Sequence, residues 1–142
     1  MLSAALIAAA CGGGAGGSST STGTPVSPTT IVAGSIGATI TLTANGAVPV
    51  DVRIEPTQRV RFVNNDTRPH QIQTNPHNFH TDCPQNNVTV INPGQTVDTS
   101  IFPDVKGCGY HDHLLPDEQK YWGLIRVGTN DDSKGPVYSK GW

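Results

Sequence analysis

Apolar and polar side chains alternate along much of this 142-residue chain. The alternation is clearest at residues 38–43 and returns at residues 50–54 and 60–62. A period of two residues is typical of strands that bury one face, whereas a helix repeats its apolar positions every three to four residues. No stretch has convincing helical spacing, so the pattern predicts an all-β chain. Further short stretches rich in apolar and β-branched residues lie at 88–91, 96–102 and 122–127.

Turn-forming residues separate these stretches. The chain contains 16 Gly and 11 Pro, and both residue types favour turns and interrupt helices. Asn92-Pro93-Gly94 lies between two of the predicted strands and has the composition of a tight turn. About seven short strands in roughly 100 residues predict a Greek-key β-sandwich.

The first residues differ from the body of the chain. Residues 1–10 form an apolar run that is far too short to span a bilayer and is typical of a signal peptide. Residues 8–11, Ala-Ala-Ala-Cys, resemble a bacterial lipobox, in which the cysteine is lipidated and becomes the new N-terminus. We therefore expect a lipoprotein with Cys11 as its lipidation site, and an ordinary secretory peptide is the alternative.

A flexible tether is expected to follow the lipidated cysteine. Residues 12–28 are rich in Gly, Ser, Thr and Pro, and such a segment cannot repay the entropy that ordering would cost. This arrangement predicts a domain held in the cell envelope, anchored to a membrane and facing the periplasm or the exterior. The predicted organisation is a signal peptide at 1–10, a lipid-anchored linker at 11–35, a folded domain at 36–128 and a polar tail at 129–142.

Composition and motifs argue against several functional classes. Charged residues of both signs make up 14% of the chain and the net charge is −2, so no basic patch suggests a nucleic-acid partner. The sequence contains no phosphate-binding loop, dinucleotide fingerprint or Gly-x-Ser-x-Gly motif. We therefore expect a binding protein and not an enzyme.

All five histidines of the chain lie between positions 70 and 113, and Cys83 and Cys108 lie in the same window. Imidazole nitrogen and thiolate sulfur are the ligands that copper and zinc prefer. The cluster therefore predicts a transition-metal site. A shell of three histidines alone would suit zinc as well as copper.

Three of the histidines are the predicted ligands. His111 and His113 are two residues apart, so on one strand face their Cα atoms are about 7 Å apart and both imidazoles can reach one ion. His70 follows Pro69 in a predicted loop, and we expect it to complete the site.

His77 and His80 are additional candidate ligands. Their spacing would suit a metal site on a helix, but Pro76 and the neighbouring Asn residues indicate a loop. The alternatives for this pair are a second, weaker copper site and a solvated position without a ligand role.

Four sequence pieces, taken in order, resemble the cupredoxin family and in particular its plastocyanin-type domains. Together they span roughly residues 38–128. The resemblance implies a copper-binding β-sandwich in which His70 is the first copper ligand, and it favours copper over zinc as the cofactor. The pieces are residues 61–66 followed by Pro69-His70, the turn at 92–96, the Cys108-x-x-His111 motif and the closing strand at 122–127.

The sequence departs from the family's ligand pattern in three ways. Met1 is the only methionine, so the usual axial thioether is missing. His113 is an additional histidine, and residues 70–83 form an unusually His-rich loop. Residues 110–113, Tyr-His-Asp-His, also resemble a cupredoxin variant that has no thiolate ligand.

Cys108 has two interpretations. As a thiolate ligand it would form, with His70 and His111, the trigonal site of a type 1 (blue) copper electron-transfer protein. Alternatively it forms a disulfide with Cys83, because lipidation of Cys11 leaves an even number of cysteines and an oxidising envelope favours their pairing. The sequence leaves both interpretations open.

The course of the strand distinguishes the two interpretations of Cys108. If one strand continues from Cys108 to His113, then Cys108 lies on one face together with Tyr110. His111 and His113 then lie on the opposite face, so Cys108 and His111 cannot hold the same ion. The blue-copper site requires the strand to end at Cys108, so that the chain turns and brings His111 round.

The sequence thus predicts a copper-binding, cupredoxin-like lipoprotein of the cell envelope that handles copper or uses it for redox chemistry. The expected partners are the copper ion, the membrane through the lipid anchor, and a redox or copper-transfer protein. No nucleic-acid partner is expected. The alternatives are the type 1 electron-transfer protein and a metal-free interaction module.

Overall fold

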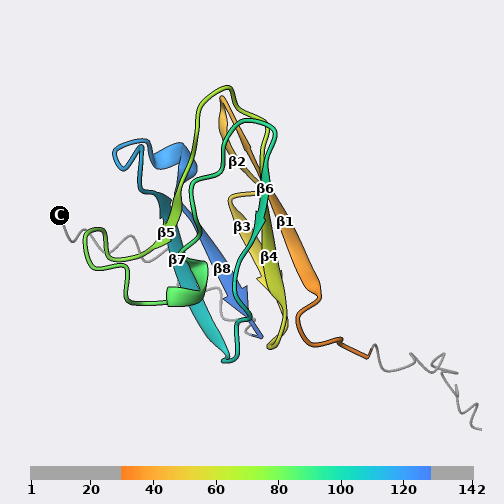
Figure 1. Cartoon of the computed structure of the whole chain (residues 1–142). Coiled ribbons are helices and arrows are strands. Elements are labelled where there is room, and N and C mark those ends of the chain that lie inside the picture. Colours follow the sequence, from red (N-terminus) through yellow and green to blue (C-terminus); the bar gives the residue numbers. More distant parts are fainter. Residues whose placement is uncertain (1–29, 129–142) are drawn as a thin grey trace, which may run out of the picture.

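A computed structural model describes residues 30–128, which form two β-sheets packed face to face (Figure 1). The predicted all-β sandwich is confirmed. The strands are β1 (Ile36–Thr43), β2 (Gly46–Val48), β3 (Asp51–Ile54), β4 (Arg59–Asn64), β5 (Ile72–Thr74), β6 (Thr96–Asp98), β7 (Lys106–Asp112) and β8 (Gly123–Val127), with the short 3-10 helices η1 (Pro84–Asn86) and η2 (Gln119–Tyr121).

Both sheets are mixed. One sheet has the strand order β2-β1-β4-β6 and the other has the order β3-β8-β7-β5. The pairs β1–β4 and β3–β8 are parallel, and the remaining pairs are antiparallel. Strand β7 lies between β8 and β5, so the His-rich loop that follows β5 begins beside β7.

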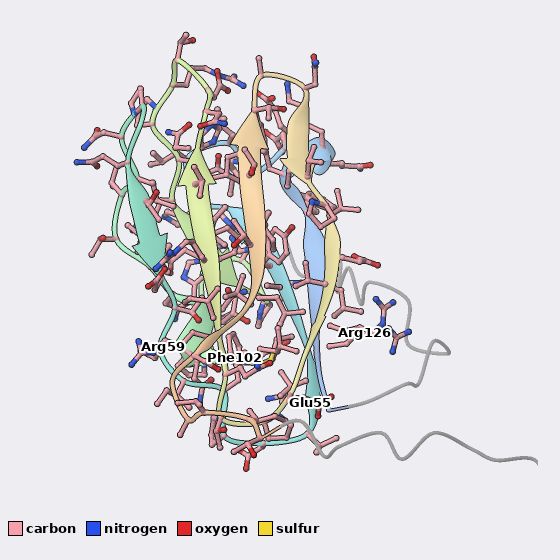
Figure 2. All side chains as sticks on the ribbon, turned by 90° about the vertical axis from the view of Figure 1, so that its right-hand side faces the viewer. Glu55, Arg59, Phe102 and Arg126 are labelled. Carbon is pink, nitrogen blue, oxygen red and sulfur yellow. A yellow bond between two sulfur atoms is a disulfide. The ribbon has the colours of Figure 1, made fainter. Side chains whose placement is uncertain are left out.

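The core fills the space between the sheets. Alternate residues of β4 are buried, with Val60 and Phe62 both 0% exposed. The Phe62 ring meets the ring of Tyr110 from β7 edge-on, with the centroids 5.7 Å apart, a geometry that aromatic pairs favour. Phe102 is 2% exposed and also lies in this interior (Figure 2). The apolar residues of the period-two pattern therefore form the core between the two sheets, as the sequence predicted.

Strand β7 continues through Asp112 without a break. Cys108, Tyr110 and Asp112 are all buried, at 1%, 0% and 0% exposure. Because successive side chains point to opposite faces of a sheet, His111 points to the face opposite Tyr110. Of the two courses that the sequence left open, the structure therefore has the continuous strand, and this strand sets the position of the site described below.

Several predicted features lie outside the described residues. These are the signal peptide, Cys11, most of the linker and the polar tail, which belong to residues 1–29 and 129–142. Within residues 30–128, no helix is both long enough and apolar enough to cross a membrane.

Candidate metal site

Four histidines from two segments meet beside strand β7. The loop of residues 75–83 contributes His77 and His80, and the end of β7 contributes His111 and, one residue beyond the strand, His113. Each imidazole offers one ring nitrogen, and these four nitrogens all lie within 4.8 Å of one another. The ring planes of His77 and His113 are stacked, with centroids 5.3 Å apart. Four imidazoles that lie this close together can surround a single metal ion.

Strand pairing explains why the loop arrives at His111. Strand β5 pairs antiparallel with β7, with Gln73 opposite His111 and Thr74 opposite Tyr110. The chain leaves β5 directly after Thr74, and the Asn75 N–H donates to the carbonyl of Gly109 at 3.3 Å. The loop thus starts against the strand that carries His111. The exposed fraction of His111 is only 4%.

The hydrogen bonds of His111 determine which of its nitrogens is available. Nδ1 lies 3.1 Å from the side-chain oxygen of Asn75. An amide oxygen only accepts, so Nδ1 carries the proton and Nε2 keeps its lone pair. Nε2 of His111 lies 3.2 Å from Nδ1 of His77. These two nitrogens therefore face each other, as two ligands of one ion do.

Two further ring nitrogens are buried and unsatisfied. His80 Nε2 and His113 Nδ1 have no hydrogen-bond partner among the residues that the structure describes. A buried polar atom without a partner is costly, and nearly all such atoms in folded proteins are satisfied. Coordination of a metal ion would supply such a nitrogen with a partner.

The loop adopts an unusual backbone conformation where it delivers His80. Asn78 and His80 have φ values of 75° and 52°. This left-handed region is uncommon for a residue other than glycine, and strain of this kind often occurs at functional sites. Hydrogen bonds hold the loop in place; among them, Asp82 N–H donates to the Asn75 carbonyl and the Asn87 amide donates to the His80 carbonyl, both at 3.0 Å.

Burial favours the neutral form of two of these imidazoles, His111 and His80. Burial first, and then the three neighbouring imidazoles, lower the pKa of His111 from 6.5 to about 4. Burial, followed by His113 and His77, also lowers the pKa of His80. Neutral imidazole is the form that binds metal ions. His111 and His80 are therefore in the metal-binding form at neutral pH.

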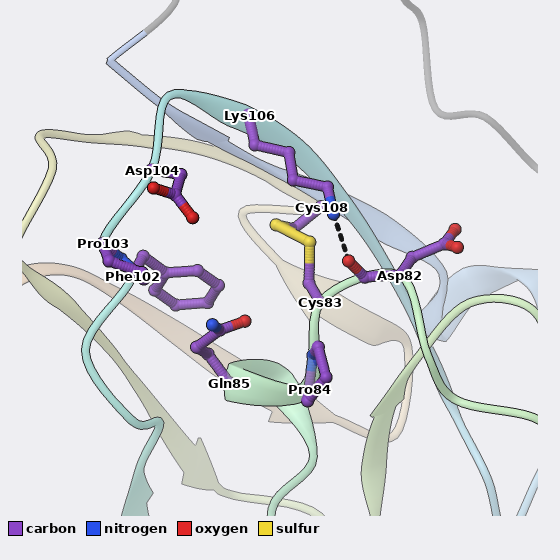
Figure 3. A pocket seen from close by; sticks show the side chains of 9 residues that line it. All are labelled: Asp82, Cys83, Pro84, Gln85, Phe102, Pro103, Asp104, Lys106 and Cys108. Atoms are coloured by element: carbon purple, nitrogen blue, oxygen red, sulfur yellow. Dashed lines mark hydrogen bonds between the residues drawn. A yellow bond between two sulfur atoms is a disulfide. The ribbon is translucent and has the colours of Figure 1, made fainter.

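Cys83 and Cys108 form a disulfide (Figure 3). The disulfide interpretation is confirmed, and the interpretation of Cys108 as a metal ligand is wrong, because a sulfur in a disulfide is not a thiolate. The bond attaches the end of the His-rich loop to β7 three residues before His111. It lines a cavity of about 170 Å³, and beside it Lys106 donates a hydrogen bond to the carbonyl of Asp82.

Comparisons with known proteins identify the architecture. No protein-family model and no curated protein matches the chain. A purple cupredoxin from Nitrosopumilus maritimus is similar in structure, with 21% identity and a TM-score of 0.51 over 63% of this chain and 98% of that chain. An oxidised amicyanin mutant has 12% identity and a TM-score of 0.53, over 64% of this chain and 81% of its own. A fern plastocyanin mutant has 9% identity and a TM-score of 0.51, over 63% and 98%.

The chain has the cupredoxin fold. The predicted resemblance is therefore confirmed at the level of architecture. The identities are low, so the likeness concerns the course of the backbone, and the site has to be argued from this chain's own residues.

His70, the first copper ligand that the cupredoxin resemblance implied, does not join the four histidines. It is 0% exposed, and its Nδ1 lies 2.6 Å from Oδ2 of Asp112 while its Nε2 lies 3.2 Å from Oδ2 of Asp66. Asp112 lies on the core face of β7, opposite His111 and His113. The structure therefore differs from the predicted ligand set: it assembles His111 and His113 with the additional candidates and places His70 in a buried carboxylate network.

Sequence reasoning missed Asn75, Asp66 and the role of Asp112. One signal was present for Asp112. Its position two residues after Tyr110 places it on the core face of the strand, and a buried carboxylate requires a partner. Nothing in the sequence indicates that Asn75 contacts His111, because their contact depends on the pairing of β5 with β7.

Proposed function

We propose that this cupredoxin-fold domain binds one copper ion through His77, His80, His111 and His113. The observation that carries the proposal is the convergence of four imidazoles, each of which offers one ring nitrogen within 4.8 Å of the others. His80 and His113 each also have a buried ring nitrogen with no hydrogen-bond partner among the described residues. Metal–nitrogen distances near 2.0 to 2.1 Å in a tetrahedral site place the nitrogens about 3.3 Å apart. The 3.2 Å between His77 Nδ1 and His111 Nε2 matches this spacing.

Two arguments favour copper over other metals. Among divalent first-row metals, Cu²⁺ has the highest affinity for a given nitrogen site, and imidazole suits it well. Three of the structurally similar amicyanin mutants were solved in the Cu(I) form. Zinc also accepts imidazole ligands, so metal competition is the natural test of this choice.

The ligand set also bears on the role of the ion. Four imidazoles without a thiolate do not provide the sulfur ligand on which a type 1 site depends, and Cys108 is paired with Cys83. We propose that the domain holds copper, buffers it or passes it on, or supports redox chemistry that depends on the bound ion. Binding, and not catalysis, is the proposed activity.

A Cu(II) titration of the purified, unreduced protein tests the proposal. We expect one tightly bound equivalent, a weak d–d absorption band without an intense thiolate band, and nitrogen hyperfine structure in the electron paramagnetic resonance (EPR) spectrum. His111→Ala and His80→Ala should each weaken binding strongly. Thr96→Ala, an exposed position on β6 of the other sheet, is the control and should bind as the wild type does.

Three outcomes would contradict the proposed copper site. Absence of stoichiometric binding would favour a metal-free interaction module. Unchanged affinity in His111→Ala would remove this cluster as the site. Retention of zinc in the presence of equimolar copper would assign the site to zinc.

We further propose that Cys11 is lipidated and anchors the domain at a membrane of the cell envelope, facing the periplasm or the exterior. The lipobox-like residues 8–11 support this, and the disulfide is of a kind that oxidising compartments favour. In a bacterial host, the wild type should partition into the detergent phase and carry acyl chains detectable by mass spectrometry. A Cys11→Ser variant with unchanged partitioning and mass would contradict the anchor.

A further inference from the structure

Asp112 lies between two proposed copper ligands in sequence, yet its side chain lies on the other face of the strand. His111 and His113 flank it, and its exposure is 0%. A buried carboxylate is stable only with charged or hydrogen-bonding partners. The partners of Asp112 therefore indicate what holds this part of the chain in place.

Both oxygens of Asp112 are used. Oδ2 lies 2.6 Å from Nδ1 of His70. Oδ1 accepts the backbone N–H of Gln71 at 3.0 Å and that of Leu114 at 3.1 Å. The backbone N–H of His113 in turn donates to the carbonyl of Gln71 at 2.7 Å. The peptide groups on both sides of His113 are thus fixed to one carboxylate and to the segment that carries His70.

His70 is itself held from two directions. Its backbone exchanges hydrogen bonds with Ile91, with N–H donated at 3.1 Å and the carbonyl accepting at 2.7 Å. Its Nε2 lies 3.2 Å from Oδ2 of Asp66. The same Asp66 oxygen accepts the Tyr121 hydroxyl at 3.0 Å and the guanidinium of Arg68 at 3.2 Å. A continuous buried network therefore runs from η2 to the end of β7.

We propose that Asp112 and His70 form a positioning pair for the copper site, which sets the orientation of His111 and His113 without contacting the ion. The inference rests on the proposed copper site. Groups that hold metal ligands in place commonly change metal affinity 10- to 100-fold when they are replaced. Here the pair acts through the backbone of residues 111–114, because the carboxylate and the two imidazoles lie on opposite faces of β7.

The test uses Asp112→Asn and His70→Gln in the full-length protein, with copper affinity measured by competition and EPR spectra recorded for the bound Cu(II). Both variants should still bind one equivalent. Their affinity should fall about 10- to 100-fold, and the parallel g value and copper hyperfine coupling should shift. Asp98→Asn is the control, because it breaks the exposed ion pair with Arg61 on the other sheet and should leave the spectrum unchanged.

A milder variant keeps the test valid if the buried substitutions prevent folding. Tyr121→Phe removes one hydroxyl at the far end of the network, and we expect a smaller change of the EPR parameters in the same direction. Nitrogen NMR of the imidazoles in the metal-free protein gives a readout that does not depend on copper. The resonances of His111 and His113 should move in Asp112→Asn and stay in place in Asp98→Asn.

The outcomes separate this inference from the proposed function. If the wild type binds no copper, the proposed function fails, and the NMR comparison alone decides whether the pair orients the two imidazoles. If copper binds and both variants match the wild type in affinity and EPR parameters, the positioning role is overturned. If His70→Gln abolishes binding as fully as His111→Ala does, His70 is a ligand and the inference is also overturned.

Discussion

The side-chain oxygen of Asn75 lies 3.1 Å from Nδ1 of His111. Because the oxygen can only accept, the contact fixes the proton of His111 on Nδ1 and leaves Nε2 to face His77 at 3.2 Å. Acceptors of this kind fix the tautomer and the ring orientation of metal-binding histidines. Asn75 therefore determines which nitrogen His111 offers to an ion.

Replacing Asn75 should weaken metal binding without removing any ligand. We expect Asn75→Ala to lower copper affinity about 10- to 100-fold, because the His111 ring loses the acceptor that orients it. Asn75→Asp retains an acceptor and should bind more tightly than Asn75→Ala. Affinities from competition titrations check this, with Asn92→Ala in the exposed 92–95 turn as the control. Equal affinities for the wild type and Asn75→Ala would show that Asn75 does not orient the ring.

The metal-free protein should lose stability as the pH falls below neutrality. The pKa of His111 is about 4 in the folded protein and 6.5 in the absence of burial and neighbours. The unfolded chain therefore binds more protons between these values, so this contribution to stability is complete above about pH 6.5 and is lost as the pH falls toward 4. The difference corresponds to about 3 kcal/mol, and the lowered pKa of His80 acts in the same direction.

Urea unfolding of the metal-free protein at pH 7.5 and pH 4.5 measures this effect. His111→Gln removes the titrating group, so its free energy of unfolding should depend less on pH than that of the wild type. A wild-type free energy that does not change over this range would contradict the buried, neutral state of His111.

The fold was largely predictable, because the period of two residues is a local property of the sequence. The alternation at residues 38–43 and 60–62 corresponds to strands β1 and β4. Residues 88–91 were predicted as a strand and form none, apart from an isolated bridge between Ile91 and His70. A strand needs a neighbouring strand to pair with, and apolar composition alone does not show whether one is present. Strand β5 has only three residues, too few to show a period.

The sequence predicted which residue types form the site, but not which of the histidines come together. The sequence locates the histidines, and the alternation along β7 correctly places His111 opposite Tyr110 and Cys108. The partners of His111 depend on the path of residues 75–83, which is fixed by contacts with β7 and by the disulfide. The position of His70 depends on Asp66 and on Asp112, which is 42 residues away in sequence. Such contacts between distant residues cannot be derived from a local pattern.

Gly123 should not tolerate a side chain. A Cβ at this position would lie 2.0 Å from the carbonyl oxygen of Val50 and 2.4 Å from the hydroxyl oxygen of Tyr110. These two groups share a hydrogen bond of 2.8 Å, which the added methyl group would displace. We expect Gly123→Ala to destabilise the domain by about 3 kcal/mol or more.

Chemical denaturation of Gly123→Ala and of a matched control measures the cost of this crowding. In Gly107→Ala the nearest atom to the new Cβ is Leu124 Cδ1 at 3.6 Å, an ordinary contact. That variant should stay within about 1 kcal/mol of the wild type. Similar stabilities for the two variants would mean that β8 does not approach Val50 and Tyr110 as described.

The disulfide should contribute to both stability and metal affinity, through different effects. Cys83 and Cys108 are 25 residues apart in sequence, and removing such a bond from a small domain typically costs about 2 to 5 kcal/mol. The bond also fixes the end of the loop that carries His77 and His80 to the strand that carries His111. The double variant Cys83→Ser/Cys108→Ser should therefore unfold more easily and bind copper more weakly than the wild type.

Serine variants are preferable to a reducing agent here, because added thiols would themselves bind copper. Denaturation of the metal-free proteins gives the loss of stability, and competition titration under conditions where both are folded gives the loss of affinity. A variant with lower stability but wild-type affinity would show that hydrogen bonds alone hold the loop, such as the one from Asp82 N–H to the Asn75 carbonyl. An intense visible band in the wild type that is lost in the serine variant would identify a thiolate ligand and would contradict the Cys83–Cys108 disulfide.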